Sequence, residues 1–239
     1  SETPEYKPEY DKTEAYVYLF EDNWPNFGDY DMNDLVMIVS IMNTTEASSE
    51  GINAKTVYLS TSVRAVGATK SLYAFAKIQG TDKVINLLEG KEAHEFMNSE
   101  PGQIINTYNK TCEAREVVNA NNLNVFIVWG DPNKNKKNEV HIAGFLGTEQ
   151  AATALTSDEY YRYKYNENID NSTEEFNNMM WGLMIPKSSF DSYPREGISI
   201  MDAYPQFMNW AKSGGKDVLD WYTLGVNDLL YQGDSAKDK

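Results

Sequence analysis

Residues 20–36, "FEDNWPNFGDYDMNDLV", concentrate acidic side chains between two apolar runs. Six candidate oxygen ligands, five carboxylates and the amide of Asn33, fall within fourteen residues: Glu21, Asp22, Asp29, Asp31, Asn33 and Asp34. Like charges at such short separations repel one another, and burying them costs free energy unless a cation or several N–H donors lie among them. The spacing therefore predicts a site that binds a positive partner.

Calcium fits these residue types, because it takes six to eight oxygen ligands from carboxylates, amides, backbone carbonyls and water. Asp29, Asp31 and Asn33 stand at alternate positions, and a tight loop with this spacing can turn all three side chains inward. Glu21 and Asp22 lie at the end of the preceding apolar run and would be brought back by the intervening "NWPNFG". We therefore expect Ca²⁺ as the cofactor of this segment.

The segment does not follow the EF-hand pattern. Asp34 stands where that loop has Gly at its sixth position, and Ser40 stands where it has Glu at its twelfth. An apolar strand follows in place of a helix. A reading without metal also stays open, since Asp and Asn favour turns by bonding their own backbone.

Other residue types give little support for catalysis, and we expect no enzymatic activity. His94 lies in a charged run and His141 in an apolar strand, without the context of a nucleophile elbow or a zinc motif. Cys112 is the single cysteine, which excludes an intrachain disulfide and predicts a buried, inert thiol. A glycosidase with two carboxylates stays open, because 36 acidic residues offer many pairs.

Tryptophan suggests a second kind of site, since aromatic rings can stack on sugars. Trp24 lies inside the acidic segment and is a candidate ligand-binding residue. The other tryptophans lie in apolar patterns, and we expect them in the core: Trp129, Trp181, Trp210 and Trp221.

The balance of acidic and basic residues limits the partners that the protein can bind. Acidic residues outnumber basic ones by 36 to 21, for a net charge of −15, so nucleic acid and anionic membranes would be repelled. No apolar run reaches the length of a membrane span.

The 239 residues suffice for one large domain. We expect a linker over 1–13, one β-rich domain over 14–232 and a flexible tail over 233–239.

Alternation of apolar and polar residues predicts many strands separated by turn-rich loops. The expected strands are 14–20, 35–42, 55–68, 71–78, 123–130, 138–147, 159–166 and 178–186. The period changes to three and four after residue 199, which predicts a helix that Asp202 caps, with Pro205 in its first turn. Residues 216–232 predict a second, shorter helical turn. The fold class is mainly β: a jelly-roll-like β-sandwich with a short helical C-terminal segment.

With these blocks placed, the sequence resembles the LruC-type domain family, secreted or surface lipoproteins of Gram-negative bacteria. Residues 20–36 match a motif like F-E-D-x-W-P-x-x-G-D-Y-D-x-N-D-L-V at nearly every fixed position. Later blocks follow in the same order: "VRAVGAT", "EVHIAGFLGTEQA", "WGLMIP", "DAYPQFMNWAKSGG" and "DWY". The chain departs from the family at "LGTEQA", where a Pro-Thr pair is more frequent.

The resemblance implies a β-rich fold, a lipid anchor upstream, and location at the bacterial cell surface, in the periplasm or outside the cell. It also implies calcium ligands, on Glu21, Asp22, Asp29, Asp31, Asn33 and Asp34. The expected function is a non-enzymatic, calcium-stabilised surface binding or adhesion domain whose partners are a divalent cation and a glycan or surface protein. The alternatives are a carbohydrate-binding module or weak glycan-active enzyme, and a metal-free scaffold.

Overall fold

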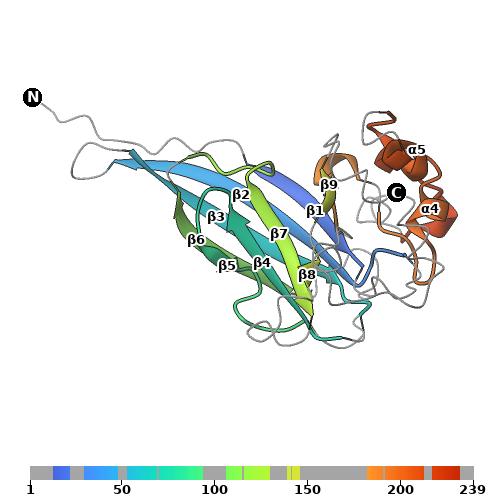
Figure 1. The fold of residues 1–239 in the computed structure, drawn as a ribbon, viewed down its shortest axis with the longest axis horizontal. Helices are drawn as coiled ribbons and strands as arrows, with labels where there is room; N and C mark the ends of the chain where they lie inside the picture. Colours follow the sequence, from blue (N-terminus) through green and yellow to red (C-terminus); the bar gives the residue numbers. More distant parts are fainter. Residues whose placement is uncertain are drawn as a thin grey trace, which may run out of the picture.

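The fold is a two-sheet sandwich with a helical segment packed at one end (Figure 1). The computed structural model describes residues 13–21, 30–47, 53–68, 70–93, 106–114, 116–129, 139–140, 142–145, 182–190, 192–212 and 217–231. Its strands are β1 (Glu14–Phe20), β2 (Leu35–Ala47), β3 (Asn53–Ala65), β4 (Leu72–Ile78), β5 (Val84–Asn86), β6 (Asn106–Ala114), β7 (Leu123–Trp129), β8 (Glu139–Val140), β9 (Ile142–Phe145) and β10 (Gly182–Pro186). These strands confirm the predicted mainly β sandwich.

One sheet has the strand order β6-β3-β2-β1-β10-β9, and the other has the order β5-β4-β7-β8. All neighbours are antiparallel except β10 and β9. The long hairpin of β2 and β3 forms the middle of the larger sheet. Because β1 pairs with β2 and β10, it lies next to this hairpin and near the C-terminal segment.

The core lies between the sheets, as the alternation along β2 shows. Its inward residues are almost fully buried: Leu35, Met37, Val39 and Ile41. Ile38 and Ser40, which lie between them on the opposite face, are half-buried. Opposite β2, Tyr18 and Phe20 of β1 are also fully buried. Residues of both sheets belong to one hydrophobic cluster, so the sheets share a single core.

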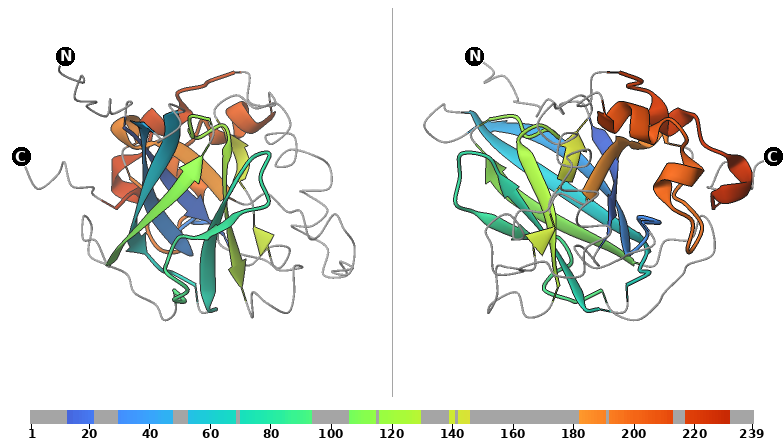
Figure 2. Two further views of the ribbon diagram at one scale, coloured as in Figure 1. Left: turned by 90° about the vertical axis from the view of Figure 1, so that its left-hand side faces the viewer. Right: turned by 45° about the vertical axis from the view of Figure 1, so that its right-hand side comes forward.

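The other face of β1 is also covered, since Val17 and Leu19 are buried. The C-terminal segment comprises α4 (Ile200–Ala203), α5 (Phe207–Lys212) and the 3-10 helices η3 (Trp221–Thr223) and η4 (Asn227–Leu229); η2 (Lys187–Ser189) follows β10. This segment packs beside β1 and β10 (Figure 2). Trp210 and Trp221, each 2% exposed, lie in its aromatic centre, as the sequence predicts.

The structure corrects the helical prediction. Ser199, and not Asp202, caps α4, because its hydroxyl accepts a hydrogen bond from the Met201 amide. Asp202 lies inside that helix. Pro205 does not fall in a first turn but between α4 and α5, where its ring cannot continue the first helix.

The predicted strand 138–147 is also corrected. It divides between β8, which pairs with β7, and β9, which pairs with β10 in the other sheet. The edge strand β6 was not predicted, because its Asn- and Thr-rich sequence lacks an apolar alternation. The predicted strand 159–166 and the predicted linker and tail, apart from Thr13, lie outside the described residues. In the described part of the chain, no helix is long and apolar enough to cross a membrane.

Candidate functional site

The two ends of the acidic segment come together where β1 ends and β2 begins. Phe20, the last residue of β1, pairs with Leu35, the first residue of β2. Glu21 and Asp34, which flank this pair, are therefore brought close together by strand register. Glu21 is 1% exposed and Asp34 is 7% exposed. The sheet thus places two carboxylates of the predicted site in a buried position.

The backbone just before β2 adopts an unusual conformation. Tyr30 and Met32 both have a φ of 56°, in the left-handed region that non-glycine residues rarely enter. Asp31 and Asn33, at 0% and 1% exposed, follow these residues into the interior. A run of alternating left-handed residues persists only where surrounding contacts hold it.

Asp31 is held by backbone donors from two segments. Its Oδ1 accepts a hydrogen bond from the Asn33 amide at 3.2 Å, and its Oδ2 accepts one from the Gly197 amide at 2.9 Å. The Ile200 amide donates to the Tyr30 carbonyl at 2.8 Å. Peptide N–H groups stabilise a charged carboxylate, so these contacts fasten the start of α4 to the acidic segment.

Asn33 joins the same segment to the chain after β3. Its Nδ2 donates to Oε2 of Glu196 at 2.8 Å, and its carbonyl accepts from the Gly67 amide at 2.9 Å. A Cβ at position 67 would lie 2.1 Å from Oδ1 of Asn33, so the close approach requires glycine there. The Ala68 amide donates to the Asp34 carbonyl at 3.3 Å.

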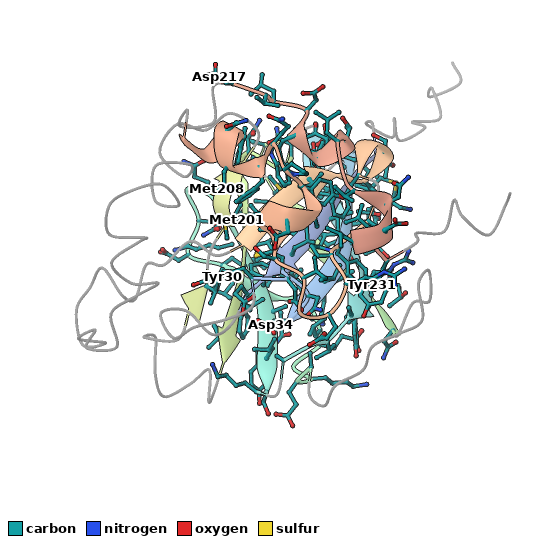
Figure 3. All side chains as sticks on the ribbon, turned by 90° about the vertical axis from the view of Figure 1, so that its right-hand side faces the viewer. Tyr30, Asp34, Met201, Met208, Asp217 and Tyr231 are labelled. Carbon is teal, nitrogen blue, oxygen red and sulfur yellow. The ribbon has the colours of Figure 1, made fainter. Side chains whose placement is uncertain are left out.

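We call this assembly the carboxylate junction. It comprises Glu21, Tyr30–Asp34, Gly67, Ala68, Glu196 and Gly197. Figure 3 shows Tyr30 and Asp34 on the side of the molecule that also presents Met201 of α4. Three segments far apart in sequence therefore converge on one set of buried oxygen atoms.

The junction contains four of the six predicted metal ligands: Glu21, Asp31, Asn33 and Asp34. Asp22, Asp29 and the predicted sugar-stacking Trp24 lie outside the described residues. Within the ranges that the structure describes, no three His, Cys, Asp or Glu side chains are grouped closely enough to hold a metal ion. The calcium ligand set stays a prediction.

Sequence reasoning missed four contributors to the junction that lie outside the acidic segment: Gly67, Ala68, Glu196 and Gly197. The local sequence gives one signal, the "REG" tripeptide, whose glycine adopts a φ of 75° and marks a turn. Nothing in that tripeptide indicates a partner more than 160 positions earlier.

The remaining candidates are placed as follows. Cys112 is 6% exposed, and burial raises the pKa of its thiol although Lys83 opposes the change. This confirms the predicted buried thiol and disfavours a nucleophilic thiolate. His94 and His141 lie outside the described residues.

Comparison with known proteins identifies the family. The domain of unknown function DUF4842 matches residues 28–222, well over half of the chain. The chain belongs to this family. The match includes Tyr30–Asp34 and the two segments that bond to them, at Gly67–Ala68 and Glu196–Gly197. It also includes Trp210 and Trp221 but not Glu21. Resemblance to the LruC-type family stays a prediction.

The fold of this DUF4842 domain is similar to a crystal structure described as a "Putative lipoprotein from Bacteroides ovatus". The TM-score is 0.52 at 15% sequence identity, and the alignment covers 92% of this chain and 75% of that chain. At this identity the likeness establishes a shared fold. No protein of curated function matches the chain significantly.

Proposed function

We propose that this DUF4842 domain is a non-catalytic, calcium-stabilised binding domain of a bacterial surface lipoprotein. The observation that supports it is the burial of Glu21, Asp31, Asn33 and Asp34 at one junction. Such burial of acidic side chains is rare in proteins unless the charge is paired, hydrogen-bonded or bound to a metal.

Hydrogen bonds at the junction stabilise part of its buried negative charge. Two amide donors reach Asp31, and the Asn33 side chain binds Glu196. The acidic segment holds four further carboxylates, and a divalent cation would offset several of them at once. A calcium sphere needs six or more oxygens, and Asp22 and Asp29 stay the predicted ligands that would complete it.

The ion would act structurally. The junction joins the β1–β2 connection to the segment before α4, so a cation there would also hold the helical segment on the sandwich. Binding to the native state alone stabilises it by mass action, by about 2.7 kcal/mol when free calcium is a hundred times its Kd. Extracellular modules bind calcium with a Kd of about 0.1–1 mM.

Two likenesses support the proposal that the protein is displayed at the cell surface. The structural neighbour from Bacteroides ovatus is described as a lipoprotein, and the acidic motif resembles a family of secreted or surface lipoproteins. A binding role is favoured over catalysis because the sequence contains neither a nucleophile-elbow motif nor a zinc-hydrolase motif.

The test combines titration calorimetry with thermal unfolding, in millimolar calcium and in EGTA. Asp34→Asn keeps the side-chain shape but removes one charge at the junction, whereas Asp228→Asn does the same at an exposed position of η4. We expect calcium to release heat and to raise the Tm of the wild type and of Asp228→Asn, and to raise that of Asp34→Asn less.

A wild type with no binding heat and no change in Tm on adding calcium would refute the metal site. If Asp34→Asn were then more stable than the wild type, the metal-free scaffold with backbone-bonded Asp and Asn would be the better account of the junction.

A further inference from the structure

A cleft of about 780 Å³ lies away from the carboxylate junction, with which it shares no lining residue. Most of its lining residues come from the end of β4, the β4–β5 turn and the loop that leads into β7, which are neighbours in one sheet. Ile142 of β9 and Met184 of β10 lie at its base. Its volume falls within the range of about 300–1,000 Å³ that is typical of small-molecule sites.

The segments of this sheet that line the cleft are held together by hydrogen bonds. The Gln79 amide donates to the Asn122 carbonyl at 2.8 Å. The Asn122 side chain accepts from the Asn119 amide and donates to the Val117 carbonyl, each at 2.8 Å. The Thr81 hydroxyl donates to the Ile78 carbonyl at 2.8 Å. These bonds fix the conformation of residues 78–81 and 117–122, which lowers the cost of ordering this part of the cleft when a ligand binds.

Two other amide side chains on the rim have no such task. Gln79 and Asn121 are exposed, and neither side chain makes a hydrogen bond within the described part of the chain. An amide offers two donors and an acceptor with two lone pairs. Neighbouring hydroxyl groups of a sugar both donate and accept, and they match this arrangement.

Charge and polarity disfavour other ligand classes. Lys77 and Asp82 both line the cleft and balance each other, so it is close to neutral although the chain has a net charge of −15. A phosphorylated or anionic ligand would need an excess of positive charge that this cleft lacks. A wholly apolar ligand would make no use of the amides at the rim.

The base of the cleft suits the other face of a sugar ring. Met184 and Leu123 are 5% and 3% exposed, and together with Ile142 they offer an apolar surface to the C–H groups of a pyranose. Polar atoms at the rim above an apolar base are the usual arrangement of a small-molecule site.

We propose that this cleft binds a neutral oligosaccharide, with Gln79 and Asn121 as hydrogen-bonding residues. The proposal gives a ligand class to the binding role proposed above. Because its site is separate from the carboxylate junction, it does not depend on calcium, and either proposal can fail while the other stands.

The test is isothermal titration of the whole chain, in millimolar calcium, with neutral gluco-, xylo-, manno- and chito-oligosaccharides and with anionic polygalacturonate and heparin. We expect at least one neutral oligosaccharide to bind. Gln79→Ala and Asn121→Ala should each raise its Kd about tenfold, the equivalent of one or two hydrogen bonds. Asn227→Ala removes an exposed amide from η4 and should leave the Kd unchanged.

Three results would overturn the proposal. The first is that no neutral oligosaccharide binds protein that circular dichroism shows to be folded. The second is binding that neither Gln79→Ala nor Asn121→Ala weakens, which would place the ligand elsewhere. The third is binding of the anionic polymers alone. A calcium titration of the same samples reports separately on the carboxylate junction.

Discussion

The strand β2 has buried polar groups near both ends, and the two ends satisfy them differently. Near its far end, Asn43 is 3% exposed and forms two hydrogen bonds with one residue, Val118. Its Nδ2 donates to the Val118 carbonyl and its Oδ1 accepts from the Val118 amide, each at 2.8 Å. Just before its start, Asp31 is fully buried and accepts from the Gly197 amide.

The difference lies in charge. A neutral amide can bond both the N–H and the C=O of one residue, so the Asn43 bridge needs no counter-charge. A carboxylate offers acceptors alone and keeps its charge, so Asp31 needs N–H donors or a cation brought from distant segments. We therefore expect stability at the start of β2 to depend on assembly of the junction and on calcium, and stability at the far end to depend on neither.

The largest expected effect comes from Asp31→Ala. The variant removes the acceptor of the Asn33 and Gly197 amides and should lower the free energy of unfolding by about 3–5 kcal/mol. Urea unfolding followed by tryptophan fluorescence measures this, because Trp210 and Trp221 lie in the segment that Gly197 precedes. Asp202→Ala, at an exposed position, is the control; equal stability of the two variants would contradict the role of Asp31.

Asn43→Ala should cost somewhat less, about 2–3 kcal/mol. It leaves the buried Val118 N–H and C=O without their side-chain partner. The loss should be the same in calcium and in EGTA, and urea unfolding in both buffers measures it. Asn106→Ala, an exposed amide of β6, provides the control. A loss that depends on calcium would remove the contrast between the two ends of β2.

Gly67→Ala should cost about 1–3 kcal/mol, as overpacking does. The added Cβ would meet Oδ1 of Asn33 at 2.1 Å. A double-mutant cycle tests the cause, because the same change should cost less in an Asn33→Ala background. Additive losses in that cycle would show that the two residues are not coupled through this contact.

Tyr18→Phe should have the smallest effect near neutral pH, within about 1 kcal/mol. The buried Tyr18 hydroxyl has no hydrogen-bond partner among the described residues, so its removal breaks no bond. Urea unfolding at pH 7 measures the change. A large loss there would show that the hydroxyl has a partner.

The Tyr18→Phe variant should also change how stability depends on pH under alkaline conditions. Burial, followed by the charges of Tyr16 and Glu14, raises the pKa of Tyr18 above its ordinary value of 10.0. The unfolded chain therefore loses this proton first, so Tyr18 lowers wild-type stability as the pH rises past about 10, by up to about 1.4 kcal/mol per unit. Stability measured from pH 8 to 11 should fall less steeply in Tyr18→Phe; identical slopes would contradict the shift.

Much of the sandwich could be predicted from local sequence. The alternation in residues 14–20, 35–42 and 71–78 indicates strands, because a half-buried pleated surface requires that pattern. The division of 138–147 between two sheets could not be predicted, since both pieces have the same local pattern and differ in their partners alone. The edge strand β6 forms because it pairs with the backbone N–H and C=O groups of β3. The residues of β6 alone do not indicate this partner.

The sequence alone predicted that a cation or a set of N–H donors lies within the acidic segment, because five carboxylates within fourteen residues repel one another. It also placed Asp31 and Asn33 among the inward-facing residues. Tertiary structure decided which groups they meet: the Gly197 amide and Glu196, from a turn more than 160 positions later, and Gly67, whose missing side chain lets two segments touch. Hydrogen bonds and close contacts act over a few ångströms in space, whereas a local sequence pattern extends over neighbouring residues only.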